Sequence, residues 1–174
     1  LLPLAAAIRF ETVSHQDPAQ FRVEVFDAFQ RWLAENYPVL HARLERERTP
    51  EGSLVFTWRG SNADLEPMLL LAHQDVVPAV EGAERWTHPP FSGVVSDGFI
   101  WGRGAIDDKS PLIALCEAVE RLATDGFQPT RTVMLAFGHD EEVSGGNGAQ
   151  RIAARLAERG VRAHLVLDEG FGII

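Results

Sequence analysis

The stretch MLLLAHQDVVP, residues 68–78, begins as an apolar run and ends in polar side chains. A continuous apolar run of this length is typical of a strand buried on both faces, as in a parallel sheet. His73 and Asp75 follow the run, and in an extended segment side chains two residues apart point to the same side. The stretch therefore predicts a core strand at 67–73 that presents an imidazole and a carboxylate at its carboxyl end.

Periodicity and turn residues predict an alternation of helices and strands around this core strand. The predicted helices are 1–9, 18–36, 110–124 and 147–159, and the predicted strands are 39–47, 53–58, 67–73, 131–138 and 163–168. A loop at 76–93 leads to a short hairpin that turns at 96–98. Strands that alternate with helices indicate parallel pairing. The expected fold class is α/β, a mainly parallel sheet flanked by helices.

Composition excludes several classes of function. The chain has 174 residues, of which 45% are hydrophobic, as expected for one domain with a real core. A formal net charge of −9 argues against binding to nucleic acid, because no basic stripe could neutralise phosphates. The apolar start, LLPLAAAIRF, is too short to span a bilayer, so we expect no membrane segment. Cys116, the one cysteine, cannot form an internal disulfide. We also predict a cytoplasmic location.

Acidic side chains follow the other predicted parallel strands. Glu141 and Glu142 come after the strand at 131–138, and Asp168 ends the strand at 163–168. In open α/β sheets ligands bind beyond the carboxyl ends of the strands. Imidazole and carboxylate oxygen together suit zinc, cobalt or manganese, although solvated loop charge is the simpler alternative.

The adjacent carboxylates of Glu141 and Glu142 suggest two different roles. Two unpaired negative charges side by side repel each other in partly buried surroundings. A bound dication would remove this repulsion for one of them and leave the other free as a base. Neighbouring side chains also diverge, which suits two separate tasks.

The segment GRGAIDDKS, residues 102–110, is poorly suited to a nucleotide. It lacks the spacing of a P-loop, and Asp107 occupies the third glycine position of a dinucleotide-binding motif, where it would repel pyrophosphate. A tight glycine turn that delivers Asp107 to a metal fits the segment better.

Four segments together resemble the dizinc exopeptidase family that includes carboxypeptidase S, aminoacylase and glutamate carboxypeptidase. They are AHQDVVP, WTHPPFSGVVSDGFIWGRGAIDDK, GHDEE and LVLDEG, in matching order and spacing, and the carboxypeptidase S branch is the most similar. The resemblance implies a hydrolase of amide bonds in small peptides or N-acyl amino acids. It also implies two zinc ions, with cobalt or manganese as substitutes, that activate a water.

The same resemblance assigns a role to each candidate residue. His73, Asp107, Glu142 and Asp168 would be the metal ligands, and Asp107 would bridge the two ions. The other two candidates, Asp75 and Glu141, would support His73 and act as the general base.

Members of the family also carry a lid or dimerisation domain and a late histidine that completes the second metal site. The chain ends six residues after Asp168, so we expect residues 1–174 to be the N-terminal portion of a catalytic domain. We further expect the lid domain to be absent, the isolated chain to be inactive, and a homodimer to form through that absent domain. A non-catalytic metal-binding or assembly module with the same fold is the alternative, and the presence of Glu141 argues against it.

Overall fold

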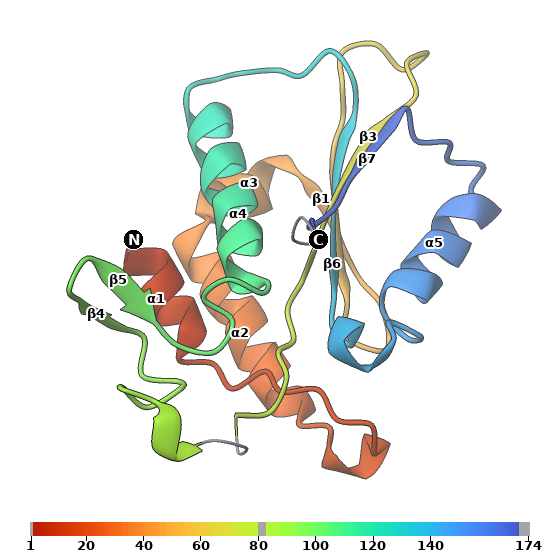
Figure 1. The fold of residues 1–174 in the computed structure, drawn as a ribbon. Coiled ribbons are helices and arrows are strands. Elements are labelled where there is room, and N and C mark those ends of the chain that lie inside the picture. Colours follow the sequence, from red (N-terminus) through yellow and green to blue (C-terminus); the bar gives the residue numbers. More distant parts are fainter. Residues whose placement is uncertain (1, 80–82, 171–174) are drawn as a thin grey trace.

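A computed structural model describes residues 2–79 and 83–170 of the chain. A five-stranded sheet lies at its centre with helices on both faces (Figure 1). The α-helices are α1 Leu2–Ile8, α2 Val23–Asn36, α3 Pro38–Arg43, α4 Lys109–Thr124 and α5 Ala149–Glu158. The strands are β1 Glu45–Arg48, β2 Leu54–Trp58, β3 Met68–His73, β4 Val94–Ser96, β5 Phe99–Trp101, β6 Val133–Gly138 and β7 Leu165–Leu167. Short 3-10 turns are η1 Pro18–Gln20, η2 Ala83–Arg85 and η3 Glu141–Val143.

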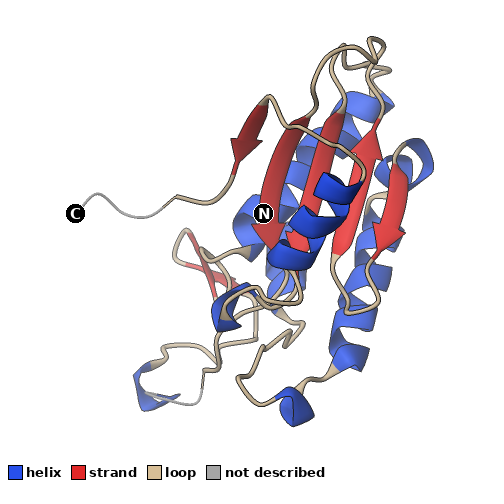
Figure 2. Cartoon of the chain, turned by 90° about the vertical axis from the view of Figure 1, so that its right-hand side faces the viewer, coloured by secondary structure: helices blue, strands red, loops and turns tan. Residues whose placement is uncertain are grey.

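The strand order in the central sheet is β1-β2-β6-β3-β7. β6, β3 and β7 are parallel, whereas β1 pairs antiparallel with β2 and β2 pairs antiparallel with β6. The α/β fold class is confirmed, and the sheet as a whole is mixed, with its parallel part around β3. Figure 2 shows the helices packed against the two faces of this sheet.

Side chains that alternate along the central strands belong to two separate hydrophobic clusters, one on each face of the sheet. Leu135 and Phe137 of β6 belong to the larger cluster, which α1 to α4 cover. Met134 and Ala136 of the same strand point to the opposite face, where α5 covers them. A strand with apolar residues at every position is thus buried on both faces, and β3 at its side is held in place by both layers.

The predicted strand at 39–47 is wrong in its first half, where the chain forms α3. The apolar residues Leu40 and Leu44 are four positions apart, so both can face the core from a short helix. Pro38 occupies the first turn, where a missing N–H costs nothing. The backbone N–H groups of Val39 and Leu40 donate to the Glu120 carboxylate at 3.1 and 2.7 Å, which caps the helix from α4.

The predicted helix at 18–36 is interrupted. Asp17 caps only the 3-10 turn η1, accepting a hydrogen bond from the N–H of Ala19 at 2.9 Å. Phe21 then adopts an extended backbone and packs its ring against Phe26, with 4.9 Å between the centroids. The aromatic contact draws Phe21 out of the helical path, and α2 begins two residues later.

Other predicted elements agree with the structure to within a few residues. The hairpin of β4 and β5 turns at Asp97 and Gly98, which both have the positive φ angles, 54° and 82°, that such a turn requires. The predicted helix at 1–9 corresponds to α1, although residue 1 lies outside the described part of the chain. Among the described residues, no helix has the length and apolar character needed to cross a bilayer.

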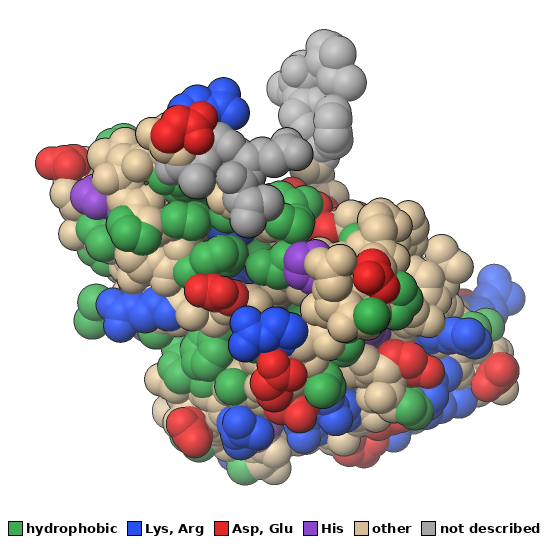
Figure 3. Space-filling view, turned by 90° about the horizontal axis from the view of Figure 1, so that it is seen from below, with side chains coloured by type: hydrophobic (Ala, Val, Ile, Leu, Met, Phe, Trp, Pro, Cys, Tyr) green, Lys and Arg blue, Asp and Glu red, His purple; other side chains and the backbone are tan. Residues whose placement is uncertain are grey.

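Strands β3 and β6 both end at the lower end of the molecule in Figure 1. Figure 3 shows this end from below, where hydrophobic side chains are interspersed with acidic and basic ones. Four of the candidate residues predicted from the sequence, His73, Asp75, Glu141 and Glu142, lie at or just after these strand ends, so the topology directs them to one end of the sheet.

Replacing Glu120 tests the cap that converts a predicted strand into α3. Glu120→Ala should lower the free energy of unfolding by about 1 kcal/mol, because two amides at the start of α3 lose their acceptor. Glu120→Gln, which keeps one oxygen acceptor, should lose less. Urea unfolding followed by circular dichroism measures both, and an unchanged midpoint for Glu120→Ala would contradict the capping role.

Candidate metal centre

His73 ends β3 with its imidazole almost completely buried, only 3% exposed. Its Nδ1 lies 2.9 Å from the carbonyl oxygen of Asp75 and 3.3 Å from the carboxylate Oδ1 of the same residue. Nδ1 therefore has both of these contacts with Asp75. Nε2 is the nitrogen that remains available to a metal, and it faces a group of carboxylates.

The Asp75 carboxylate is fully buried and joins His73 to the segment after β6. Its Oδ1 accepts the backbone N–H of Glu141 at 3.1 Å, and its Oδ2 accepts that of Glu142 at 3.2 Å. Ser14 donates its hydroxyl to Oδ2 at 2.6 Å. Burial alone would raise the pKa of Asp75, but the hydrogen bonds from His73 and Ser14 outweigh it and lower that pKa.

Asp107 reaches the site from a tight turn before α4. Its Oδ1 lies 2.9 Å from Nε2 of His73. Gly104 has a φ of +83°, and a Cβ there would lie 2.9 Å from Val76, so only glycine lets the turn pack this closely on the end of β3. The peptide bond between Asp107 and Asp108 is cis.

Two buried residues, Asp108 and Lys109, connect this turn to β3 and to the N-terminal segment. Asp108 accepts the backbone N–H of His73 at 2.9 Å through Oδ2, while its buried Oδ1 has no protein partner. Lys109 donates its ammonium to the carbonyl oxygens of Ala7 and Phe10 at 3.0 and 2.5 Å, at the end of α1. Burial lowers the pKa of Lys109 to about 7, against the opposing charge of Asp75.

Glu141 and Glu142 begin the turn η3 after β6, and they differ in exposure and contacts. The Glu141 side chain is 50% exposed and places Oε2 3.9 Å from Nε2 of His73. Glu142 is partly buried, and its pKa is raised by burial and then by the charges of Asp107, Asp75 and Glu141. One glutamate is thus open to a substrate or water, and the other is held among like charges.

After β7 the structure brings Glu169, rather than Asp168, to His73. The Oε1 of Glu169 lies 3.5 Å from Nε2 of His73. Asp168 is exposed, and its Oδ1 accepts the N–H of Glu169 at 2.9 Å. The structure therefore brings His73, Asp107, Asp75 and both glutamates of η3 together, as the sequence predicts, and leaves Asp168 just outside the group.

The carboxylates around His73 raise the pKa of several groups at the site. Burial opposes protonation of His73, but Asp75, Asp108 and Glu169 outweigh it and raise its pKa to about 10. The pKa of Glu169 is also raised, by burial and by the charges of Asp107, Glu141 and Asp168, against the lowering effect of His73. Burial is also the main cause that raises the pKa of Asp108 to about 7. The carboxylates thus crowd one imidazole and keep it protonated.

The donor set fits a divalent metal. Within the described residues, one group of three can hold an ion with its ligand atoms all within 4.8 Å of one another, and it consists of His73, Asp107 and Glu169. Three protein ligands of imidazole and carboxylate type are what catalytic zinc sites use, with a further position left open. A cation here would also relieve the repulsion that raises the pKa of Glu142 and Glu169.

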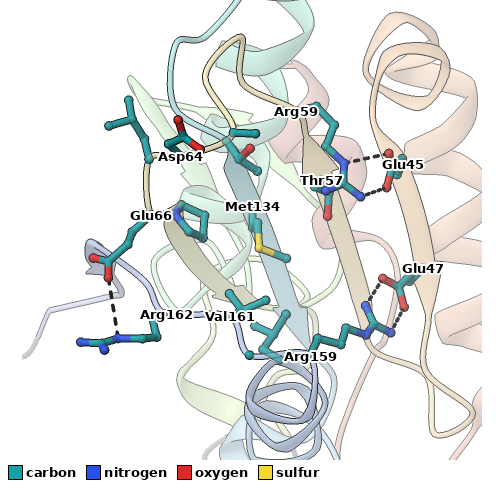
Figure 4. Close-up of a pocket in the computed structure, with 16 residues that line it drawn as sticks. Glu45, Glu47, Thr57, Arg59, Asp64, Glu66, Met134, Arg159, Val161 and Arg162 are labelled. Atoms are coloured by element: carbon teal, nitrogen blue, oxygen red, sulfur yellow. Dashed lines mark hydrogen bonds and ion pairs between the residues drawn. The ribbon is translucent and has the colours of Figure 1, made fainter.

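A cavity of about 500 Å³ lies elsewhere in the molecule. Figure 4 shows that its charged side chains pair across its walls, as in the bidentate contacts of Arg59 with Glu45 and of Arg159 with Glu47. These contacts pair the charges of Arg59 with Glu45 and of Arg159 with Glu47, and no histidine lines this cavity among the described residues. The cavity is therefore a weaker candidate site than the strand ends.

Comparison with known proteins agrees with this geometry. Residues 69–172 match the model of peptidase family M20/M25/M40. The chain belongs to this family. Carboxypeptidase S of Saccharomyces cerevisiae is 41% identical over 187 residues, covering 98% of this chain and 31% of that protein. An N-fatty-acyl-amino acid synthase/hydrolase of Bos taurus is 42% identical over 173 residues, covering 98% of this chain and 34% of that protein.

Solved structures of M20 enzymes share the fold. An M20 metallo-carboxypeptidase from Sulfolobus solfataricus superposes with a TM-score of 0.75 at 21% identity, covering 99% of this chain and 37% of that one. Human carnosine dipeptidase 1 gives a TM-score of 0.76 at 22% identity, covering 99% of this chain and 38% of that one. The chain thus spans about a third of the length of the M20 relatives that it matches.

Sequence reasoning missed two residues that the structure brings to the candidate site, Glu169 and Ser14. Glu169 follows Asp168 directly, and an acidic pair at a strand end does not reveal which member turns inward. Ser14 lies in the N-terminal segment, far from every motif, and only the fold brings it to Asp75. The acidic pair was a usable signal for Glu169, whereas nothing in the sequence pattern distinguishes Ser14 from an ordinary serine.

The raised pKa of His73 predicts that zinc binding releases a proton. With a pKa of about 10 the imidazole is protonated at pH 7, and it must become neutral to bind a metal. The apparent affinity for zinc should therefore rise with pH, by about tenfold per unit for one proton released. Calorimetry at pH 7 in two buffers with different ionisation enthalpies counts the protons. Release of no proton would mean that His73 is not a ligand or is not charged in the metal-free protein.

Proposed function

We propose that this chain supplies the first part of the catalytic domain of a zinc-dependent hydrolase. Its substrates would be small peptides or N-acyl amino acids. The observation that carries the proposal is the convergence of His73, Asp107 and Glu169 at the strand ends, with the half-exposed Glu141 beside them. Fold likeness alone would not support a reaction, because the same fold can host different activities.

The chain offers ligands for two zinc ions. His73 and Asp107, with an acidic residue after β7, would hold one ion, and Glu142 with a shared Asp107 would contribute to the second. The sequence assigns the acidic ligand to Asp168, and the distance of 3.5 Å to His73 favours Glu169. When bound, zinc would polarise an amide carbonyl and lower the pKa of a water; cobalt or manganese would fit the same donors.

The protein residues have separable tasks. Asp75 holds the Nδ1 side of His73 and so directs Nε2 toward the metal. Glu141 is exposed enough to accept a proton from an attacking water and to pass it to the leaving amine. The Asp75 carboxylate also accepts hydrogen bonds from two backbone N–H groups at the start of η3. These bonds fix the start of the turn, so that Glu141 keeps its position near His73.

The substrate class rests on the relatives. Their names include carboxypeptidase S and an N-fatty-acyl-amino acid synthase/hydrolase, so amides next to a free carboxylate are the common chemistry. The domain boundaries, the homodimer through a further domain and the cytoplasmic location all stay predictions from the sequence.

The test is a metal analysis and a substrate screen on the full-length gene product. Zinc content near two ions per chain, and hydrolysis of dipeptides or N-acyl amino acids that a chelator abolishes, would support the proposal. Tight zinc binding without hydrolysis of any amide would instead favour a non-catalytic metal-binding module.

Glu141→Gln should separate the base from the metal site. The substitution removes the proton acceptor but keeps the size of the side chain, so turnover in the full-length protein should fall by about 10²–10⁴-fold. Zinc content should remain close to that of the wild type. Turnover equal to that of the wild type would exclude Glu141 as the general base.

Asp107→Ala and His73→Ala should differ in the number of metal ions lost. A bridging carboxylate serves both ions, so Asp107→Ala should deplete both, whereas His73→Ala should mainly empty one site. Elemental analysis of the two purified variants measures this. Equal losses of one ion in both variants would contradict a bridge at Asp107.

A further inference from the structure

The N-terminal segment before η1 runs alongside the residues that follow β3. Val13 forms a parallel bridge with Val76, and the N–H of Ser14 donates to the carbonyl of Val76 at 3.2 Å. The N–H of Val76 in turn donates to the carbonyl of Thr12 at 3.0 Å. The end of β3 is therefore flanked by a segment that lies outside the range matched by the family model, residues 69–172.

Two hydroxyl groups of this segment reach the end of β3, and they have different acceptors. Thr12 donates Oγ1 to the backbone carbonyl of Gln74 at 2.7 Å. Ser14 donates Oγ to the carboxylate Oδ2 of Asp75 at 2.6 Å. Thr12 and Ser14 are 0% and 2% exposed, so both bonds are shielded from water. Only the bond from Ser14 involves a charged acceptor, and such bonds are shorter and stronger than neutral ones.

The carboxylate that Ser14 holds is the connection between three parts of the site. Oδ1 of Asp75 faces Nδ1 of His73 and the N–H of Glu141, and Oδ2 faces the N–H of Glu142. These three contacts are 3.1 to 3.3 Å long, so none of them is as short as the bond from Ser14. Rotation of the carboxylate about χ2 would lengthen several of them together. The shortest bond to Asp75 therefore comes from outside the residues that the motifs identify.

We propose that Ser14 is a positioning residue of the metal centre. Its hydroxyl fixes the rotation of the Asp75 carboxylate, so that one oxygen supports His73 while both oxygens hold the start of η3. Ser14 would act through Asp75 and touch neither metal nor substrate. The effect on metal binding rests on the proposed function, but the effect on η3 does not.

Three variants distinguish a positioning role from general stabilisation. Ser14→Ala removes the hydroxyl that reaches Asp75. Thr12→Val is the matched control, because it removes an equally buried hydroxyl bond from the same segment but leaves the carboxylate untouched. Ser14→Thr keeps a hydroxyl at this position and should retain the bond; Ser14 lines a cavity of about 420 Å³.

The first measurement is amide hydrogen exchange in the metal-free chain, read by NMR at Glu141 and Glu142. Ser14→Ala should reduce the protection of these two amides by about tenfold, the effect of one hydrogen bond to a charged group. Thr12→Val should leave the exchange protection of both amides unchanged, even if it lowers the melting temperature of the protein as much as Ser14→Ala does. Ser14→Thr should return them to wild-type protection. Equal exchange in Ser14→Ala and Thr12→Val would overturn the proposal.

The second measurement is zinc affinity by calorimetric titration of the same variants. Ser14→Ala should bind zinc about tenfold more weakly, at the lower end of the range known for residues that orient metal ligands. Thr12→Val and Ser14→Thr should match the wild type. Unchanged affinity in Ser14→Ala would overturn the link to the metal centre. Failure of the wild type to bind zinc would count against the proposed function, and hydrogen exchange would still decide the role of Ser14 at η3.

Discussion

A single buried carboxylate, that of Asp75, joins segments that are far apart in the sequence. It contacts the imidazole of His73 at the end of β3. It also accepts hydrogen bonds from two backbone amides of η3 after β6 and from the hydroxyl of Ser14 in the N-terminal segment. An unpaired carboxylate in this position would be costly to bury, so each donor also lowers the cost of placing the charge there. The geometry of the metal centre depends on these bonds being formed together.

The sheet makes this arrangement possible because β3 and β6 are parallel and in register. His73 lies beside Gly138, so both strands end at the same level. Gly138 carries no side chain, and a Cβ added there would touch the Cβ of His73 at 3.9 Å. Helices on both faces of the sheet pack against the two strands. The candidate site residues can therefore sit on short turns without the site losing its shape.

Much of this could be predicted from the sequence, because the decisive signals are local. The apolar run of β3 ends at His73, and that alone places an imidazole at the edge of the sheet. The prediction of a strand at 39–47 was wrong in its first half because the deciding contact there is distant in the sequence. Its alternation also suits a short helix, and the choice depends on Glu120, about 80 residues away in the chain. Likewise, whether Asp168 or Glu169 faces the imidazole depends on the path of the backbone after β7, which no spacing encodes.

The buried ammonium of Lys109 has a consequence for how the molecule opens. It ties the turn that carries Asp107 to the carbonyl oxygens of Ala7 in α1 and of Phe10 just after it, while Val13 pairs with the chain just after β3. Residues 2–14 therefore cannot detach without leaving the buried amine of Lys109 unsatisfied and exposing one flank of the site. We therefore expect residues 2–14 and the turn that carries Asp107 to open together in partial unfolding. A ligand that binds at the rim would accordingly protect the start of the chain from proteolysis, although it touches none of those residues.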